Sequence, residues 1–238
     1  MAGKNDFRGL KQFGTKELKF KQGVHMDAAY KGSVLAAPIY SAARKGVCAA
    51  LTMEWLKSKL SEGRFPGPFS SAPMPARQNL MHQAAVWHAA QFQIAFHQEK
   101  QKDQTMDYRL QKLAGEFGLK LRDDQDLVDD HFIWVFEKAA DTVAVNEGIF
   151  CNVRMEERNG THTGHAIGII KPIDGIRFFD SNVGAYKFDA PFKFTKFYEL
   201  WGQLYNDKMR CRPSRCWGYR ATDIASVTPA IFRKAEKT

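Results

Sequence analysis

The chain lacks several features that would place it in well-known classes. Four cysteines in 238 residues are too few for a disulfide scaffold. No apolar run approaches the length of a membrane span, and the polar, lysine-rich start has no apolar signal-peptide region. We therefore expect a protein that folds in a cytosol-like compartment, or one that leaves its cell by a route without a cleaved signal.

The charge is also without a concentrated block. Lysine and arginine total 35 against 26 acidic residues, for a net charge of +9. These cations are spread along the chain, and no run resembles the basic arm of a nucleic-acid-binding protein. We expect a generally basic surface and no nucleic-acid partner, with a non-enzymatic basic binding module as an alternative.

Hydrophobic residues are plentiful, and their order predicts the fold class. They make up 44% of the chain, which is ample for a packed core. Helical spacing dominates first, and short strands with hairpin turns follow, which is typical of an α+β fold. Residues 1–30 read as an arm, a leader or a first strand, and residues 31–238 as one domain. We expect helices at 48–60, 76–100, 104–117, 127–139 and 192–205, and strands at 148–155, 165–171, 176–180, 186–189 and 216–220.

Two irregular stretches invite specific expectations. Residues 61–75 are rich in glycine and proline and predict a long loop near the functional cleft. Residues 123–130 carry a cluster of aspartates, which we expect to cap the helix that follows. The cluster lacks the glycine and the spacing of a calcium loop.

Cys48 is the first candidate for chemistry. It follows Gly46 and Val47 and opens an apolar helical pattern. Unpaired N–H groups and the helix dipole at a helix N-terminus favour a thiolate over a thiol. A thiolate nucleophile needs a base, so we searched the predicted strands for one.

His165 and Asp180 supply a candidate base and a group to orient it. His165 opens one apolar strand, and Asp180 ends the next. A hairpin turn at about 172–175 places both at the same end of adjacent antiparallel strands. An aspartate beside an imidazole fixes its tautomer and leaves the other nitrogen for the nucleophile. The spacing thus predicts a triad of Cys48, His165 and Asp180.

Other readings of these residues remain open. His162 is a rival base, although the strand start and the adjacent glycine favour His165. A zinc site is a further alternative, with His162, His165, Cys211 and Cys216 as its ligands.

Three motifs together resemble the YopT/AvrPphB family of bacterial effector cysteine proteases, which belong to the papain-like group. They are Gly46-Val47-Cys48 opening a helix that contains Trp55, the run from Gly164 to Gly168, and the run from Phe178 to Gly184. The order Cys, His, Asp and the short hairpin between the last two also match. The resemblance covers roughly residues 44–188.

The resemblance implies a papain-like fold and peptide hydrolysis through a thioester, without cofactor or metal. It implies an oxyanion bound by the Cys48 N–H and by an amide side chain a few residues earlier. No Asn or Gln stands there, so Ser41 and Arg44, or a backbone N–H, are the nearest substitutes. Asn182 is a further candidate for oxyanion or substrate binding.

The same resemblance implies a protein secreted by a bacterium without a cleaved signal peptide. Its substrate would be a protein in the cytosol of a target cell, and an immunity protein or a secretion chaperone would be its partners. A papain-like glutamine deamidase or transglutaminase-type acyl transferase is an alternative, because the same triad serves those reactions.

Overall fold

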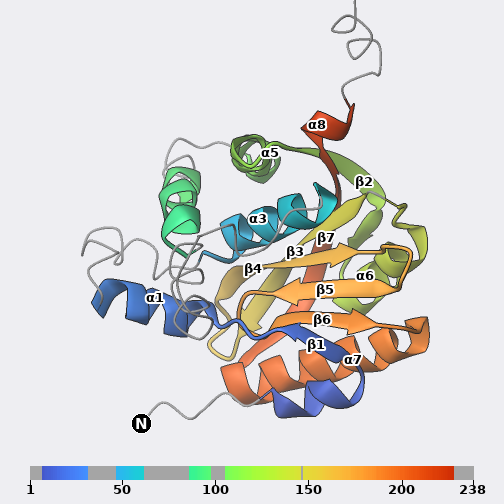
Figure 1. Cartoon of the computed structure of the whole chain (residues 1–238). Coiled ribbons are helices and arrows are strands. Elements are labelled where there is room, and N and C mark those ends of the chain that lie inside the picture. Colours follow the sequence, from blue (N-terminus) through green and yellow to red (C-terminus); the bar gives the residue numbers. More distant parts are fainter. Residues whose placement is uncertain (1–6, 32–46, 62–85, 98–104, 146, 228–238) are drawn as a thin grey trace, which may run out of the picture.

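One antiparallel sheet of seven strands organises the fold, with helices on both of its faces (Figure 1). These features come from a computed structural model, which describes residues 7–31, 47–61, 86–97, 105–145 and 147–227. Buried apolar side chains form two clusters, and successive residues of the central strands alternate between them. The predicted α+β class is confirmed.

The strands follow the order β1-β6-β5-β4-β3-β7-β2 across the sheet. Every neighbouring pair is antiparallel. The edge strand β1 comes from the N-terminal region, so part of residues 1–30 is a strand of the sheet. The strands are β1 (Thr15–Leu18), β2 (Leu119–Asp129), β3 (Gly148–Glu157), β4 (His162–Ile170), β5 (Ile176–Asp180), β6 (Gly184–Phe188) and β7 (Cys211–Asp223).

Helices α3 and α5 lie over one face of the sheet, and α6 and α7 lie over the other (Figure 1). Helix α7 continues directly into a short π-helical turn, η2. The helices are η1 (Arg8–Gln12, a 3-10 helix), α1 (Gln22–Lys31), α3 (Cys48–Leu60), α5 (Met106–Glu116), α6 (Phe132–Thr142), α7 (Pro191–Leu204), η2 (Tyr205–Met209) and α8 (Ile224–Val227), with a further helix at 86–97.

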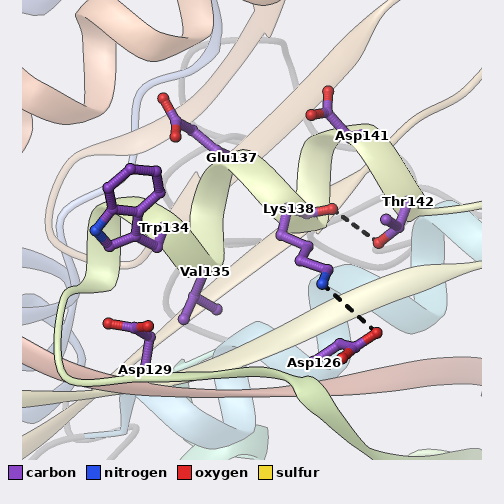
Figure 2. Close-up of a pocket in the computed structure, with 8 residues that line it drawn as sticks. All are labelled: Asp126, Asp129, Trp134, Val135, Glu137, Lys138, Asp141 and Thr142. Atoms are coloured by element: carbon purple, nitrogen blue, oxygen red, sulfur yellow. Dashed lines mark hydrogen bonds and ion pairs between the residues drawn. The ribbon is translucent and has the colours of Figure 1, made fainter.

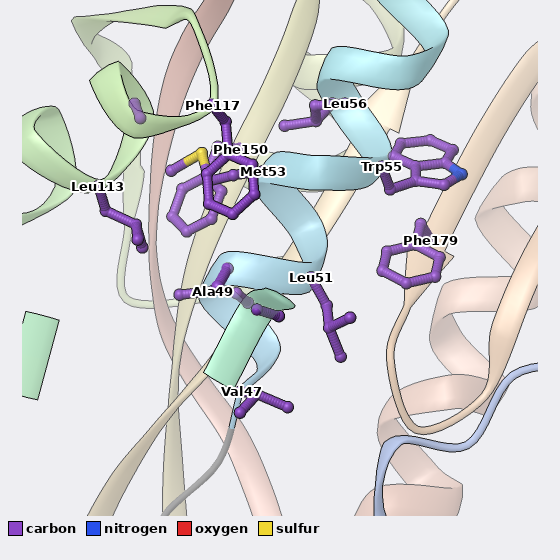
Figure 3. Packing of buried hydrophobic residues seen from close by; sticks show 14 of the residues in the cluster. Val47, Ala49, Leu51, Met53, Trp55, Leu56, Leu113, Phe117, Phe150 and Phe179 are labelled. Atoms are coloured by element: carbon purple, nitrogen blue, oxygen red, sulfur yellow. The ribbon is translucent and has the colours of Figure 1, made fainter. Parts of the chain in front are cut away.

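Helix α3 approaches the sheet closely because β4 has a glycine beneath it. A Cβ atom on Gly168 would lie 2.8 Å from the Trp55 ring. That ring instead stacks on Phe179 of β5, with centroids 5.3 Å apart and planes 13° from parallel (Figure 3). This stacking fixes the height of α3 above the strands, and with it the position of Cys48 at the start of the helix.

The opposite face is packed mainly with aromatic rings. Phe178 of β5 meets Phe197 of α7 edge to face, with ring centroids 5.1 Å apart. Trp201, one helical turn further along α7, lies 6.2 Å from Phe178 by the same measure. These contacts anchor α7 beneath the end of β5, where Asp180 stands.

Several predicted elements are confirmed. Helix α3 has the predicted bounds, Cys48–Leu60, and β5 has the predicted bounds, Ile176–Asp180. Helix α5 is followed, as expected, by Gly118, whose φ of 66° is the left-handed conformation that favours glycine just beyond a helix end. Strands β3, β4, β6 and β7 and helix α7 lie where the sequence placed them, with ends shifted by a few residues.

The expectation for the aspartate cluster was wrong. Residues 119–129 form β2, paired with the long strand β7, and α6 begins only at Phe132. The pairing register shifts between Asp123 and Val128, so the acidic run lies at an irregularity of an edge strand. Of the cluster, Asp129 accepts a hydrogen bond from the His131 backbone N–H at 2.7 Å, just before the helix.

Part of two predictions lies outside the described residues. These are the loop expected at 61–75, from residue 62 on, and the ends of the helix expected at 76–100, of which 86–97 is described and helical. In the described part of the chain, no helix combines the length and the apolar character needed to cross a membrane.

Candidate active site

His165 and Asp180 meet at the end of β5. Asp180 pairs in register with Ile167 of β4, two residues beyond His165. Side chains two residues apart on a strand share a face, so His165 and Asp180 are diagonal neighbours. The Nε2 atom of His165 lies 2.9 Å from Oδ1 of Asp180.

Asp180 is fully buried and collects hydrogen bonds from three further groups. The indole N–H of Trp201 donates to Oδ2 at 2.7 Å, and the Tyr205 hydroxyl donates to Oδ2 at 2.8 Å. The backbone N–H of Asn182 donates to Oδ1 at 2.7 Å. Burial raises the pKa of Asp180, but the His165 charge and these donors outweigh it and hold the pKa below its usual value. Asp180 is therefore a carboxylate, and it accepts a hydrogen bond from His165.

The hydrogen bond to Asp180 assigns the tautomer of His165. Because a carboxylate only accepts, Nε2 must carry a hydrogen, which leaves Nδ1 for the Cys48 thiol, a hydrogen-bond partner of the ring. Burial lowers the pKa of His165, but the charge of Asp180 and the bonds to Asp180 and Cys48 raise it to about 10. An imidazolium at neutral pH can in turn stabilise a thiolate.

Cys48 is the first residue of α3 and is half-buried. Burial raises the pKa of its thiol, but the hydrogen bond and the charge of His165 lower it further, and the net shift is downward. The N-cap residue Val47 offers no side-chain acceptor to the first turn. The N–H groups of that turn therefore depend on other acceptors. His165 thus links Cys48 to the buried carboxylate of Asp180.

One amide side chain reaches this helix N-terminus from elsewhere in the sequence. Gln93, in the helix at 86–97, is 3% exposed, and its Oε1 accepts from the Ala50 backbone N–H at 3.1 Å. Since a backbone N–H can only donate, the orientation of the amide is fixed. Its Nε2 donates to none of the described residues.

A cleft of about 180 Å³ opens beside Cys48 and His165. It lies between the start of α3, the helix at 86–97, α5 and the beginning of β4, and most of its wall is apolar. Cys48, Ala49, Gln93, Phe96, His97, Met106, Arg109, Leu110, Phe150, Asn152, Thr163, Gly164, His165 and Ala166 line it.

The remaining candidates fall in different places. Ser41 and Arg44 lie outside the described residues. Asn182 contacts the surroundings of Asp180: its Nδ2 donates to the Tyr205 hydroxyl at 3.1 Å, and its Oδ1 accepts from Gln22 at 2.9 Å. His162 is exposed at the start of β4, opposite Glu156 in the register.

For the zinc alternative, no group of three or more potential metal ligands occurs among the described histidines, cysteines and acidic residues. A separate surface hollow of about 500 Å³ lies between β2 and α6, and neither His165 nor Asp180 lines it (Figure 2). Within it, the Lys138 ammonium group pairs with Asp126 at 3.5 Å. That hollow is not lined by cysteine or histidine.

Sequence reasoning missed four residues of this site. Trp201 fits the apolar face of the helix expected at 192–205, although an indole N–H needs an acceptor when buried. Tyr205, four residues later, is the last residue of that expected helix. Gln93 lay inside an apolar helical pattern, and Gln22 lay in a segment without periodicity. The spacing of Trp201 and Tyr205, one helical turn apart, was the one signal available.

Comparisons with known proteins bear on the fold. No protein-family model and no curated protein matches the chain. Among solved structures, the chain is similar to the crystal structure of the Pseudomonas avirulence protein AvrPphB, with 15% sequence identity and a TM-score of 0.53. The match covers 76% of this chain and 94% of that chain. At this identity the likeness is one of fold, and it agrees with the papain-like fold that the motifs imply.

Proposed function

We propose that this protein is a papain-like cysteine endopeptidase with Cys48 as nucleophile, His165 as base and acid, and Asp180 as the group that orients His165. The observation that carries the proposal is the contact chain from Cys48 through His165 to a buried Asp180. The fold likeness to AvrPphB supports the proposal. In agreement with the motif resemblance, Cys48 begins helix α3, and His165 and Asp180 lie on the neighbouring strands β4 and β5.

The reaction follows from this arrangement. The Cys48 thiolate attacks a peptide carbonyl carbon, and the carbonyl oxygen becomes an oxyanion. The oxyanion lies at the N-terminus of α3, where the Cys48 N–H donates to it. Protonated His165 then gives its Nδ1 proton to the leaving amine, and the C–N bond breaks to leave a thioester. His165 next takes a proton from water, which hydrolyses the thioester and releases Cys48.

Gln93 supplies the second oxyanion donor in this proposal. The expected amide before Cys48 is missing from the sequence, while Gln93 lines the cleft beside the nucleophile. Its Oε1 is held by Ala50, so the Nε2 group is the end that remains to donate. A donor fixed in advance by a backbone hydrogen bond stabilises an oxyanion without reorganising.

By the same family likeness, we propose that the protein is a bacterial effector whose substrate is a protein in the cytosol of a target cell. The experiment is a comparison of new protein N-termini in extracts treated with wild type or with Cys48→Ala. Cys211→Ala is the matched control, because Cys211 is a half-buried thiol outside the site. We expect new N-termini with wild type and the control alone.

Other outcomes of this experiment would contradict the proposal. Intact substrates in which glutamine has become glutamate would assign the site to a deamidase. New N-termini that persist with Cys48→Ala would remove Cys48 from the reaction altogether.

A further inference from the structure

The cleft beside Cys48 contains a buried arginine that has no counter-ion among the described residues. Arg109 of α5 is 6% exposed and lines the same cleft as Cys48 and His165. None of the ion pairs among the described residues includes Arg109. Asp107, two residues earlier on α5, accepts from the Tyr219 hydroxyl at 2.7 Å instead.

The partners that Arg109 does have are weak. Its Nη2 donates to the thioether sulfur of Met106 at 3.6 Å, and its guanidinium carbon lies 4.9 Å from the centre of the Phe96 ring. Its Nε is buried and has no hydrogen-bond partner in the part of the chain that the structure describes. A thioether and a ring face do not neutralise a guanidinium, so the charge is desolvated without full compensation.

An uncompensated buried charge of this kind destabilises the free protein, and a ligand of opposite charge would relieve the cost. No aspartate or glutamate of the described residues lines the cleft, whereas two histidines do, so its polar groups favour an anion. Guanidinium groups bind carboxylates through paired, parallel hydrogen bonds, which also fixes the direction of the ligand. The apolar walls formed by Phe96, Phe150 and Leu110 would bury the carbon stem of such a group.

We infer that Arg109 makes this cleft a subsite for an acidic side chain of the substrate, Asp or Glu, close to the bond that is cut. The inference rests on the proposed function and narrows its substrate class. Arg109 is a specificity-determining residue in this scheme. It pairs with the substrate away from the scissile carbonyl and takes no part in proton transfer.

The test uses two thiol reagents that differ only in charge, iodoacetyl-glutamate amide and iodoacetyl-glutamine amide. Each alkylates Cys48 and carries its side chain into the neighbouring cleft. We expect wild type to react faster with the glutamate reagent by about tenfold or more, as one charge-assisted pair would give. Arg109→Met should abolish that preference, so that the two reagents react at nearly the same rate.

Two controls separate specificity from structure. Arg158→Met removes the same charge from an exposed position in the β3–β4 turn, and it should keep the glutamate preference. Arg109→Met should fold, and its thermal midpoint should stay equal or rise, because methionine fits the apolar wall and removes a desolvated charge. Arg109→Lys should retain part of the preference.

The outcomes that overturn the inference are distinct from those that overturn the proposed function. Equal glutamate-to-glutamine ratios in wild type and Arg109→Met, with Cys48 reacting fast, would refute the acidic subsite alone. A Cys48 that reacts no faster than Cys211 with either reagent would refute both. Cleavage of peptide libraries adds a second arm. Enrichment of Asp or Glu at one internal position supports the inference, whereas dependence on a free C-terminal carboxylate contradicts it.

Discussion

The charge on Asp180 should set the pH range in which Cys48 is reactive. In Asp180→Asn the side chain keeps its shape but loses the charge that raises the pKa of His165 to about 10. That pKa should fall toward the ordinary histidine value of about 6.5. At neutral pH the imidazole would then be largely neutral, and Cys48 would lose its cationic neighbour.

The size of the effect follows from Coulomb's law. Two unit charges about 4 Å apart interact by about 4 kcal/mol at an effective dielectric constant of about 20. Since each pKa unit corresponds to about 1.4 kcal/mol, the midpoint of Cys48 reactivity should rise by up to about three pH units. The Cys48 pKa, now below its usual value, would return to or above about 8.5.

The assay is the rate of Cys48 alkylation by iodoacetamide between pH 4 and 10, roughly the range in which thiols and imidazoles titrate. Cys48→Ala measures the background from the other thiols, of which Cys151 and Cys216 are buried. Near-ultraviolet circular dichroism would check that Asp180→Asn keeps its packing. Superimposable profiles for wild type and Asp180→Asn would refute the idea that Asp180 acts through His165.

Three further predictions concern Gln93, Tyr205 and Gly168. Gln93→Glu keeps an oxygen that accepts from the Ala50 N–H but loses the Nε2 donor, so kcat should drop by about 10²–10³ with KM little changed. An unaltered kcat would show that Gln93 does not bind the oxyanion. Tyr205→Phe should lower the free energy of unfolding by about 1.5–3 kcal/mol in urea denaturation at pH 7, because the buried Asp180 carboxylate loses a hydrogen-bond donor. This loss should shrink as the pH falls and Asp180 becomes protonated. A loss that does not depend on pH would contradict this reason. Gly168→Ala should destabilise by about 1–3 kcal/mol, since its Cβ would lie 2.8 Å from Trp55, and thermal unfolding with Gly115→Ala as control, where nothing lies within 4 Å, would test it.

The pH dependence of stability has a direction that follows from His165. Its folded pKa lies above its unfolded value, so its stabilising contribution is complete below about pH 6.5 and is lost as the pH rises through about 10. Wild type should therefore lose free energy of unfolding over this range more steeply than Asp180→Asn. Urea denaturation at successive pH values would measure the difference, and parallel curves would contradict the assignment.

Much of the fold could be predicted because local patterns and tertiary structure agree. Helix α3 is apolar and buried over its first turns and carries its lysines near its end, and β4 and β5 contain apolar runs ended by turn residues. The acidic strand β2 was missed because its pairing with β7, not its own composition, makes it extended. A charged edge strand with an irregular register carries no clear period of two.

In the candidate site, too, some residues could be predicted from the sequence and others could not. A cysteine at a helix start and a histidine and an aspartate across a hairpin are juxtaposed by rules that operate over short distances. Trp201, Gln93 and Arg109 come from helices whose positions depend on how they pack, and each side chain has a long apolar part that fits an amphipathic pattern. Whether their polar atoms have hydrogen-bond partners depends on the tertiary structure and could not be predicted from the sequence pattern.

The bond between Gln22 and Asn182 spans 160 positions of the chain, and it supports the residues around Asp180. Contacts of such sequence separation form late, because closing long loops costs entropy before packing repays it. Reactivity at Cys48 should accordingly be among the last properties to appear when the denatured chain refolds. A nascent or partly folded chain would lack this reactivity until the N-terminal segment has reached its place beside Asn182.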